Sequence, residues 1–183
     1  MTLKASKMRM AATPDVIHMR ELAGEGITLE PQVAAHASGL FAVIRDPDLY
    51  TYIDDKEPVS EAALRQRLAR LESRQSPDGS EHWLNWVVRA ADGQIAGYVQ
   101  ATVTPDHAAE IAYVLGKAFW RHGIGTIACR LMIGELRARY GVTRLTATLD
   151  PANAASVALL HRLGLRQVWE DIPGNEVGYA LEL

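Results

Sequence analysis

Apolar and polar residues alternate along the chain with two different periods, and the changes of period predict where strands and helices lie. Alternation with a period of two, together with β-branched and aromatic side chains, predicts strands. The strands expected on this basis are 16–22, 27–30, 83–89, 94–103, 110–115, 144–149, 167–170 and 176–183. Turn residues separate several of them: Ala23-Gly24-Glu25-Gly26 predicts a turn after the first strand, and Asp92-Gly93 predicts a hairpin in the middle of the chain.

Apolar residues at helical spacing predict helices in several of the intervening segments. The expected helices are 33–44, one that follows Ser60 and carries Leu64, Leu68 and Leu71, 125–140, and 153–163. Asp46-Pro47 ends the first of them, because the residue before a proline disfavours the helical conformation. Ser60 suits a helix N-cap, and Gly164 stands where a C-capping glycine belongs. The arginines of the second helix are expected to form a solvated face; they are Arg65, Arg67, Arg70 and Arg74.

The order of these segments predicts the fold class. A long antiparallel meander in the middle of the chain is followed by a strand–helix–strand–helix–strand run. We therefore expect an α+β fold, that is, a mixed α/β arrangement in which a sheet is flanked by helices. A length of 183 residues suits one domain, which we expect over 15–183, after a flexible N-terminal tail over 1–14.

Charge and composition narrow the class of protein. The net charge of −3 does not indicate nucleic-acid binding, which usually requires a basic surface. No apolar run approaches the roughly 18 residues of a membrane span. Neither nucleic acid nor a membrane is therefore an expected partner. Cys129 is the only cysteine, which excludes an internal disulfide and favours a reducing, cytoplasmic location. We expect it to be a small buried residue. No Cys/His cluster has metal-ligand spacing, so no metal is predicted.

One segment, Phe119-Trp120-Arg121-His122-Gly123-Ile124-Gly125-Thr126, connects a predicted strand to a predicted helix. The first amides of a helix lack intrahelical partners and carry partial positive charge, so such a turn can bind a pyrophosphate. Gly123 and Gly125 allow a ligand to approach the backbone closely, and Arg121 adds a positive charge. A tight connection without a ligand is the alternative. The P-loop and the dinucleotide fingerprint are disfavoured, because the Lys-Ser/Thr pair and the third glycine are missing.

Together with the sequence around it, this loop resembles the coenzyme A loop of the GNAT superfamily of N-acetyltransferases. The pattern of that loop is Q/R-x-x-G-x-G/A. The resemblance runs from about Ile27 onward and is densest over 110–165. Trp120 stands where the family usually has Gln or Arg, and here the chain is similar to the ribosomal-protein N-acetyltransferase (RimJ/RimL-like) branch. The other matches to that branch are Asn153-Ala154-Ala155-Ser156, Gly164-Leu165, and Gly26-Ile27-Thr28-Leu29-Glu30-Pro31 followed by a helix and Asp46-Pro47.

The resemblance implies an acetyltransferase that takes acetyl-CoA as its co-substrate and lets an amine attack the thioester directly. It implies a GNAT-like sheet, mostly antiparallel and splayed, whose gap admits the pantetheine arm. The residues implied in cofactor binding are Tyr113, Val114, Leu115, Arg121, His122, Gly123, Ile124, Gly125, Thr126 and Asn153. The amide of Val114, or of a neighbour within 113–115, is the expected donor to the thioester carbonyl.

Two residues are the candidates for catalysis. Glu110 begins the strand that leads into the loop, where the family often places a base; a solvent-facing strand glutamate is the alternative, and Glu30 is a weaker candidate. Ser156 can donate a hydrogen bond to the departing thiolate, but serine is a poor acid and can act by orientation instead. Many GNAT enzymes have a tyrosine four residues later, where this chain has Leu160. Asn153 also suits a helix N-cap.

The expected acceptor is a primary amine, either a protein N-terminus, as the branch implies, or a small molecule. Tyr50, Tyr52, Trp83 and Trp86 are candidates to line its cleft. Strand alternation puts the two tryptophans on opposite faces, so one of them belongs to the core. The acidic segment Asp54, Asp55 and Glu57 can attract a cationic acceptor or form a solvated loop. A homodimer is compatible with the sequence.

Two other function classes stay open at the level of the sequence. The first is a non-catalytic acyl-CoA-binding or regulatory domain, which Leu160 favours and Glu110 disfavours. The second, which the loop motif makes less favourable, is a protein-interaction module built on the same scaffold.

Overall fold

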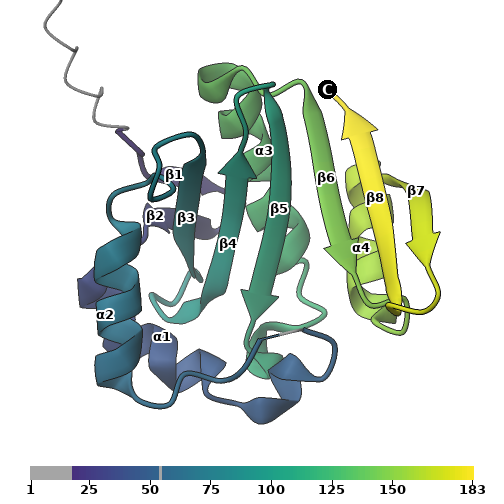
Figure 1. Ribbon diagram of the computed structural model, residues 1–183. Helices are drawn as coiled ribbons and strands as arrows, with labels where there is room; N and C mark the ends of the chain where they lie inside the picture. The colour runs from purple at the N-terminus through teal and green to yellow at the C-terminus, as the bar shows by residue number, and fades with distance from the viewer. Residues whose placement is uncertain (1–17, 54) are drawn as a thin grey trace, which may run out of the picture.

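The computed structural model describes residues 18–53 and 55–183; the tail expected over 1–14 lies outside them. Within these residues the strands form one eight-stranded sheet in the order β1-β2-β3-β4-β5-β6-β8-β7 (Figure 1). The strands are β1 (Leu22–Gly24), β2 (Ile27–Pro31), β3 (His82–Arg89), β4 (Ile95–Val103), β5 (Ala108–Leu115), β6 (Arg144–Leu149), β7 (Arg166–Asp171) and β8 (Glu176–Glu182). Every neighbouring pair is antiparallel except β5 and β6, which are parallel.

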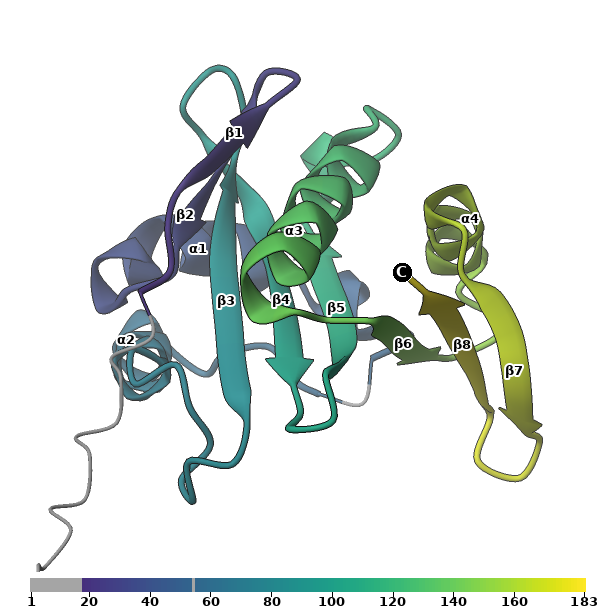
Figure 2. The same cartoon turned by 90° about the horizontal axis from the view of Figure 1, so that it is seen from above.

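Helices cover both faces of the sheet. They are the α-helices α1 (Ala37–Ile44), α2 (Glu61–Leu71), α3 (Ile124–Tyr140) and α4 (Ala154–Leu163), and the 3-10 helices η1 (Ala34–His36), η2 (Pro47–Tyr50) and η3 (Lys117–Phe119). α3 and α4 lie on one face, and α1 and α2 lie on the other (Figure 2). The expected fold class, a mostly antiparallel mixed sheet flanked by helices, is confirmed. No helix in the described part of the chain is long and apolar enough to cross a membrane.

The first hairpin differs from the expected one. The predicted strand over 16–22 is wrong for the described residues, because only Leu22 of residues 18–22 is in a strand. β1 instead includes Ala23 and Gly24, which were expected to turn, and Gly24 pairs with Ile27. The turn needs only Glu25 and Gly26, whose φ angles of 48° and 80° are left-handed. This two-residue loop matches the twist of a hairpin, so the strands can continue up to it.

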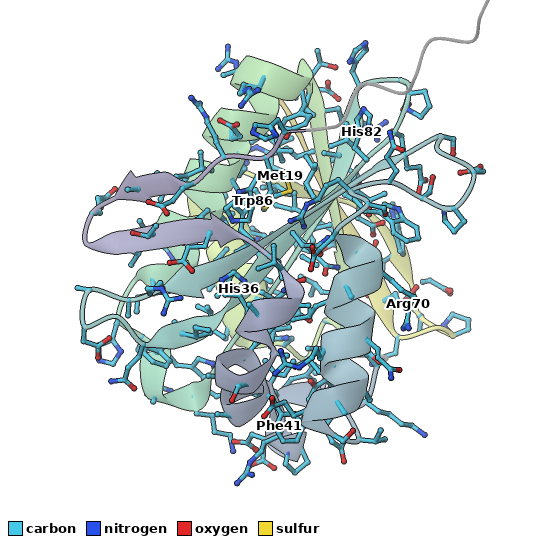
Figure 3. All side chains as sticks on the ribbon, turned by 90° about the vertical axis from the view of Figure 1, so that its left-hand side faces the viewer. Met19, His36, Phe41, Arg70, His82 and Trp86 are labelled. Carbon is cyan, nitrogen blue, oxygen red and sulfur yellow. The ribbon has the colours of Figure 1, made fainter. Side chains whose placement is uncertain are left out.

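Apolar side chains form a core on each side of the sheet. On one side, Trp86 and Leu29 from the sheet pack with Met132 from α3, and all three are fully buried. Trp86 also donates a hydrogen bond from Nε1 to the carbonyl oxygen of Arg20 (3.1 Å), and it lies in the interior near Met19 (Figure 3). On the other side, α1 and α2 pack on β4 and β5. The prediction that one of Trp83 and Trp86 is a core residue is confirmed for Trp86.

The arginines of α2 do not form the uniform solvated face that the sequence predicts. Arg74, just beyond the helix, is only 8% exposed, and its Nη2 donates to the carbonyl oxygen of Gln32 (2.5 Å). Burial lowers the pKa of this guanidinium. Arg65 is exposed and pairs with Glu61 (2.7 Å). A helical pattern alone cannot separate these cases, because the strand and loop that bury Arg74 come from elsewhere in the chain.

The two parallel strands pair only at their beginnings. Residues 108–110 of β5 face residues 144–146 of β6, and beyond Glu110 and Thr146 the strands are not paired with each other. Figure 1 shows them diverging towards their C-terminal ends. β5 stays paired with β4 as far as Leu115, while β6 stays paired with β8 along its length. Each strand therefore follows its own half of the sheet, as the splayed sheet of the expected fold requires.

Gly97 holds β4 unusually close to the diverging end of β5. It lies opposite Leu115 with a φ angle of 150°, a conformation that L side chains rarely adopt. A Cβ atom added to Gly97 would overlap the carbonyl oxygen of Val114 and approach the Cα atom of Leu115 to 2.8 Å. Both contacts are with backbone, which cannot rotate away. The absence of a side chain at this position therefore fixes the path of β5 where it leaves β6.

Replacing Gly97 with alanine should destabilise the fold by about 2 to 4 kcal/mol, because it combines backbone strain with a clash against β5. The measurement is the free energy of unfolding from chemical denaturation. Gly134→Ala is the matched control: it lies within α3 with nothing within 4 Å of the added Cβ atom. That change should stabilise the protein by about 0.5 to 1 kcal/mol. Equal stability of the Gly97→Ala protein and the unmodified protein would contradict this role.

Candidate active site

A cleft of about 640 Å³ opens where β5 and β6 diverge. Residues 111–114 of β5 form one side of it and residues 147–150 form the other. On the face of α3 and α4 its lining includes Asn153, Ser156 and Leu160. On the opposite face it includes Thr51, Tyr52, Ile53, Asp55, Arg67, Tyr98 and Gln100, and Gly174, Asn175 and Glu176 close its end. The cleft thus passes through the sheet and reaches both of its faces.

Two hydrogen bonds establish which backbone groups of β5 face this cleft. At one end of the strand Thr104 N donates to Ala108 O (2.9 Å), and at the other Gly116 N donates to Ala96 O (2.9 Å). Both bonds follow the β4–β5 register, and peptide groups alternate between the two sides of a strand. Even-numbered residues of β5 are therefore directed to β4, and odd-numbered residues are directed to the gap.

This alternation decides among the three amides expected at the thioester. The amides of Tyr113 and Leu115 face the gap, whereas the peptide group of Val114 faces β4 in the pair Tyr98↔Val114. The structure therefore favours the neighbours of Val114 over Val114 itself. The carbonyl oxygen of Leu115 already accepts a hydrogen bond from the indole Nε1 of Trp120 (2.7 Å). The tryptophan that replaces Gln or Arg in the family loop thus satisfies the last carbonyl group of the open edge.

The loop before α3 has the form that an anion site needs. Gly123 is the N-cap of α3 with a left-handed φ of 78°, and nothing lies within 4 Å of an added Cβ atom. Arg121 and His122 are exposed, and the φ angle of Arg121 is also left-handed at 62°. The first amides of a long helix therefore open to the surface beside a fixed positive charge, which suits a pyrophosphate.

Gly125 has a different reason to be glycine. It is buried, and an added Cβ atom would lie 2.9 Å from Cδ1 of Leu159 and 3.2 Å from Cδ1 of Leu115. The missing side chain lets the first turn of α3 pack against both α4 and β5. Gly125 thereby holds the loop in place relative to the cleft. Ile124 and Thr126, its neighbours in the first turn, are half-buried.

The N-terminal part of α4 lines the cleft on the face of α3 and α4. Asn153 is its N-cap, as the sequence predicts, and its Oδ1 accepts a hydrogen bond from Ser156 N (3.1 Å). The hydroxyl of Tyr113 donates to the carbonyl oxygen of Ser156 (3.3 Å). Burial raises the pKa of Tyr113, so its phenol stays protonated. Leu160, which stands where the resemblance implies a tyrosine, is fully buried and also lines the cleft.

Glu110 lies at the point where the two strands part. It is exposed, and it sits opposite Thr102 of β4 and Thr146 of β6. Side chains alternate along a strand, so Glu110 shares a face with Ala112 and Val114, the face that α1 and α2 partly cover. It is not among the residues that line the cleft itself, but it stands next to Ala112, which does. Glu30 is elsewhere, in an ion pair with Arg89 (2.6 Å) on the other side of β3.

The aromatic residues expected in the acceptor cleft divide into two groups. Tyr52 lines the cleft and is 44% exposed. The other three candidates do not line it: Trp86 is in the core, Trp83 donates from Nε1 to Glu81 (2.9 Å), and Tyr50 donates to the carbonyl oxygen of Ile44 (2.8 Å). Burial raises the pKa of Tyr50 to about 12. Tertiary packing therefore takes up most of the aromatic side chains that the sequence offers.

Sequence analysis missed several residues that line the cleft on the face of α1 and α2, chiefly Tyr98 and Gln100. Both belong to β4 and lie opposite Val114 and Ala112. Alternation along β4 puts them on one face, but only the pairing with β5 shows that this face borders the cleft. Asp55 belongs to the acidic segment that the sequence singles out, while Asp54 lies outside the described residues. Asp55 pairs with Arg67 of α2 (3.3 Å).

The segment between α1 and α2, which contributes Thr51, Tyr52 and Ile53 to the cleft lining, is tied to the loop after β5. Lys117 Nζ lies 3.1 Å from Oδ2 of Asp46 and also forms an ion pair with Asp48. Asp46 in turn caps η2 by accepting from the backbone amide of Asp48 (3.0 Å). The Asp46-Pro47 element of the sequence therefore links this part of the cleft lining to the segment that precedes the Gly123 loop.

The sequence matches the family described as Acetyltransferase (GNAT) domain over residues 27–166. The chain therefore belongs to the GNAT family of acetyltransferases. This membership confirms the expected class of enzyme, which transfers an acetyl group to an amine, and it disfavours the interaction-module alternative. The family uses acetyl-CoA as the acetyl donor. The comparison with curated proteins gave no match.

Solved structures share the fold over nearly the whole chain. RimL, a ribosomal L7/L12 alpha-N-protein acetyltransferase in complex with coenzyme A, has a TM-score of 0.76 and 18% identity, covering 90% of this chain and 98% of that one. A ribosomal-protein-S5-alanine acetyltransferase from Vibrio fischeri has a TM-score of 0.75 and 18% identity, covering 90% and 97%. A GNAT-family acetyltransferase from Bacillus anthracis has a TM-score of 0.73 and 18% identity, covering 89% and 98%. The names of the first two agree with the RimJ/RimL-like resemblance.

Replacing Gly123 with aspartate should weaken coenzyme A binding roughly tenfold or more, because it brings a carboxylate to the place where the pyrophosphate would bind. The measurement is calorimetric titration with coenzyme A and acetyl-CoA. Gly93→Asp is the matched control, since Gly93 has a left-handed φ of 84° and open space but lies in the β3–β4 hairpin. The control should bind coenzyme A normally. Equal affinity of the two variants would rule out the loop as the pyrophosphate site.

Proposed function

We propose that the protein transfers the acetyl group of acetyl-CoA to a primary amine by direct attack of the amine on the thioester. The cleft through the sheet is the observation that carries this proposal. Acetyl-CoA would enter from the face of α3 and α4, beside the loop at Gly123, and the amine would enter from the face of α1 and α2. The two substrates would then meet in the gap between β5 and β6. The acceptor is either a protein N-terminus or a small molecule.

The residues of the cleft suit the acetyl donor. The unpaired edge of β5 offers the amides of Tyr113 and Leu115 to the amide groups of the pantetheine arm and to the thioester carbonyl. A donor directed at that carbonyl stabilises the negative charge that develops as the amine attacks. Arg121, His122 and the first amides of α3 would hold the pyrophosphate. Asn153 would act by capping α4, which orients Ser156 at the cleft.

The amine must reach the thioester without its proton. An alkyl amine has a pKa of about 10 in water, so at neutral pH a base is needed. Glu110 is the proposed base, acting directly or through water, because it stands exposed at the apex of the gap beside Ala112. The cleft also carries the acidic groups Asp55 and Glu176, and these would attract a protonated amine before it is deprotonated.

The departing thiolate needs less assistance. A thiol has a pKa of about 8.5, so the thiolate is a tolerable leaving group. Ser156 is the proposed donor to its sulfur atom, and Tyr113 would position Ser156 through the hydrogen bond to its carbonyl oxygen. The direct mechanism needs no nucleophile from the protein. The single cysteine agrees with this, because Cys129 is fully buried and burial raises its pKa to about 12.

Glu110→Gln should lower kcat roughly 100- to 10,000-fold, which is the usual contribution of a general base. The KM for acetyl-CoA should change little, since Glu110 lies on the acceptor face. Thiol release from acetyl-CoA with an amine acceptor measures both constants. Glu170→Gln, on the exposed edge strand β7, is the control and should keep full activity. A Glu110→Gln enzyme with an unchanged kcat would exclude Glu110 as the base and leave the cleft assignment intact.

No acetyl-enzyme should accumulate when the protein is incubated with acetyl-CoA in the absence of an amine. The expected intact mass is that of the unmodified chain, because the Cys129 thiol is buried and protonated at neutral pH. Mass spectrometry of the denatured protein makes this measurement. A stoichiometric gain of one acetyl group at a cleft residue, formed at the rate of turnover, would contradict direct attack. Binding of coenzyme A without transfer to any amine would instead favour the non-catalytic acyl-CoA-binding alternative.

A further inference from the structure

The acceptor side of the cleft carries hydrogen-bonding side chains that the described residues leave without partners. Tyr98 and Gln100 lie on β4 next to the open part of β5, opposite Val114 and Ala112. Both line the main cleft and a small adjoining hollow beneath α1 and α2. Within residues 18–53 and 55–183, neither the Tyr98 hydroxyl nor the Gln100 amide makes a hydrogen bond to another group. Both side chains are half-buried at the wall of the cleft, so their polar groups are free to bind water or a ligand there.

Arg67 adds a positive charge to the same wall. It comes from α2, lines both the cleft and the hollow, and has its side chain 51% exposed. One contact of 3.3 Å, from Nη1 to Oδ2 of Asp55, engages it among the described residues. A guanidinium has five N–H donors, so most of its capacity is available. Asp55, Arg67 and Tyr98 line both the cleft and the adjoining hollow, so the three groups lie close together.

The chemical state of Tyr98 makes it a donor too. Burial raises the pKa of its phenol, so the hydroxyl keeps its proton at neutral pH. Arg67, Tyr98 and Gln100 can therefore all donate to one oxygen atom or to a pair of oxygen atoms. Carboxylates in the same cleft, Asp55 and Glu176, can receive an ammonium group. This side of the cleft thus presents hydrogen-bond donors from β4 and α2. Carboxylates that can bind an ammonium group lie in the same cleft.

We propose that Arg67, Tyr98 and Gln100 form a subsite for a carbonyl oxygen that neighbours the reacting amine. This inference rests on the proposed acetyl transfer and names its substrate class: an α-amino carbonyl compound rather than a simple alkyl amine. A peptide N-terminus supplies such an oxygen as an amide, and a free amino acid supplies it as a carboxylate. Both sources share the chemistry that the three donors recognise. An alkyl amine lacks the oxygen atom and leaves the three donors unsatisfied. A polar site discriminates strongly against a substrate that lacks its hydrogen-bonding group.

Two acceptors of the same shape test the subsite. Glycinamide has a carbonyl group next to its aminomethyl group, and isobutylamine has methyl groups in place of the oxygen and nitrogen atoms. The measured quantity is kcat/KM for each acceptor in the thiol-release assay, with saturating acetyl-CoA. The ratio of the two constants in a variant is compared with the same ratio in the unmodified enzyme, so that the different basicities of the two amines cancel.

Arg67→Gln should lower kcat/KM for glycinamide roughly 10- to 100-fold, because the charged guanidinium would no longer donate a hydrogen bond to the carbonyl oxygen. The kcat/KM for isobutylamine should stay nearly unchanged, because isobutylamine has no such oxygen. Tyr98→Phe should act in the same direction with a smaller change. Arg70→Gln is the matched control: it lies on the same helix, is exposed, and is shown on α2 in Figure 3. It should leave both constants unaltered.

Glycine and a short peptide with an N-terminal glycine distinguish the two sources. Faster acetylation of glycine indicates the carboxylate of an amino acid, and faster acetylation of the peptide indicates a protein N-terminus; either result supports the subsite. Equal losses for glycinamide and isobutylamine in Arg67→Gln would overturn the subsite, since a purely structural role affects both. Acetylation of neither acceptor, or of any other amine, by the unmodified enzyme would overturn the proposed transfer and the subsite with it.

Discussion

The cleft exists because β5 and β6 stop pairing with each other after Glu110 and Thr146. The backbone groups beyond that point are left without a neighbouring strand. Beyond Glu110 the two strands part, so the peptide groups of Tyr113 and Leu115 have no neighbouring strand. An open edge inside a sheet is costly unless something else satisfies it. Trp120 satisfies one carbonyl group, and the amides of Tyr113 and Leu115 face the cleft. In the proposed function, the pantetheine arm of acetyl-CoA would bind these amides and complete the sheet.

Packing on both sides keeps this gap open. Gly97 lets β4 approach the far end of β5, and Gly125 lets α3 pack against Leu115 and Leu159 from α4. Across the sheet, Lys117 connects the end of β5 to the segment between α1 and α2. These contacts hold β5 to its own half of the sheet. The gap thus results from strong attachment of each strand elsewhere, which explains how a buried sheet can carry a cleft through its centre.

The two faces of the cleft have different chemical characters, and this difference separates the substrates. The face of α3 and α4 has a helix N-terminus, capped helices and a protonated phenol, which suit phosphates and a thiolate. The face of α1 and α2 combines Arg67 and Tyr98 with carboxylates, which suits an amine that carries a carbonyl group. In the proposed function, an acceptor approaching from this face would reach the thioester without competing with acetyl-CoA for its site. This arrangement requires no covalent intermediate on the protein.

The sequence by itself determined the features that depend on neighbouring residues. Periodicity located nearly all the strands and helices, Asn153 and Ser60 were recognisable as caps, and the Gly123 loop was visible as a strand–helix turn. The first hairpin was placed too early, because Glu25 itself adopts a left-handed conformation. Only the tertiary structure decided that Arg74 is buried, that Trp86 belongs to the core, and that Tyr98 borders the cleft. These outcomes depend on which strands pair and which helices cover them, and contacts between residues distant in sequence leave no periodic signal in the chain.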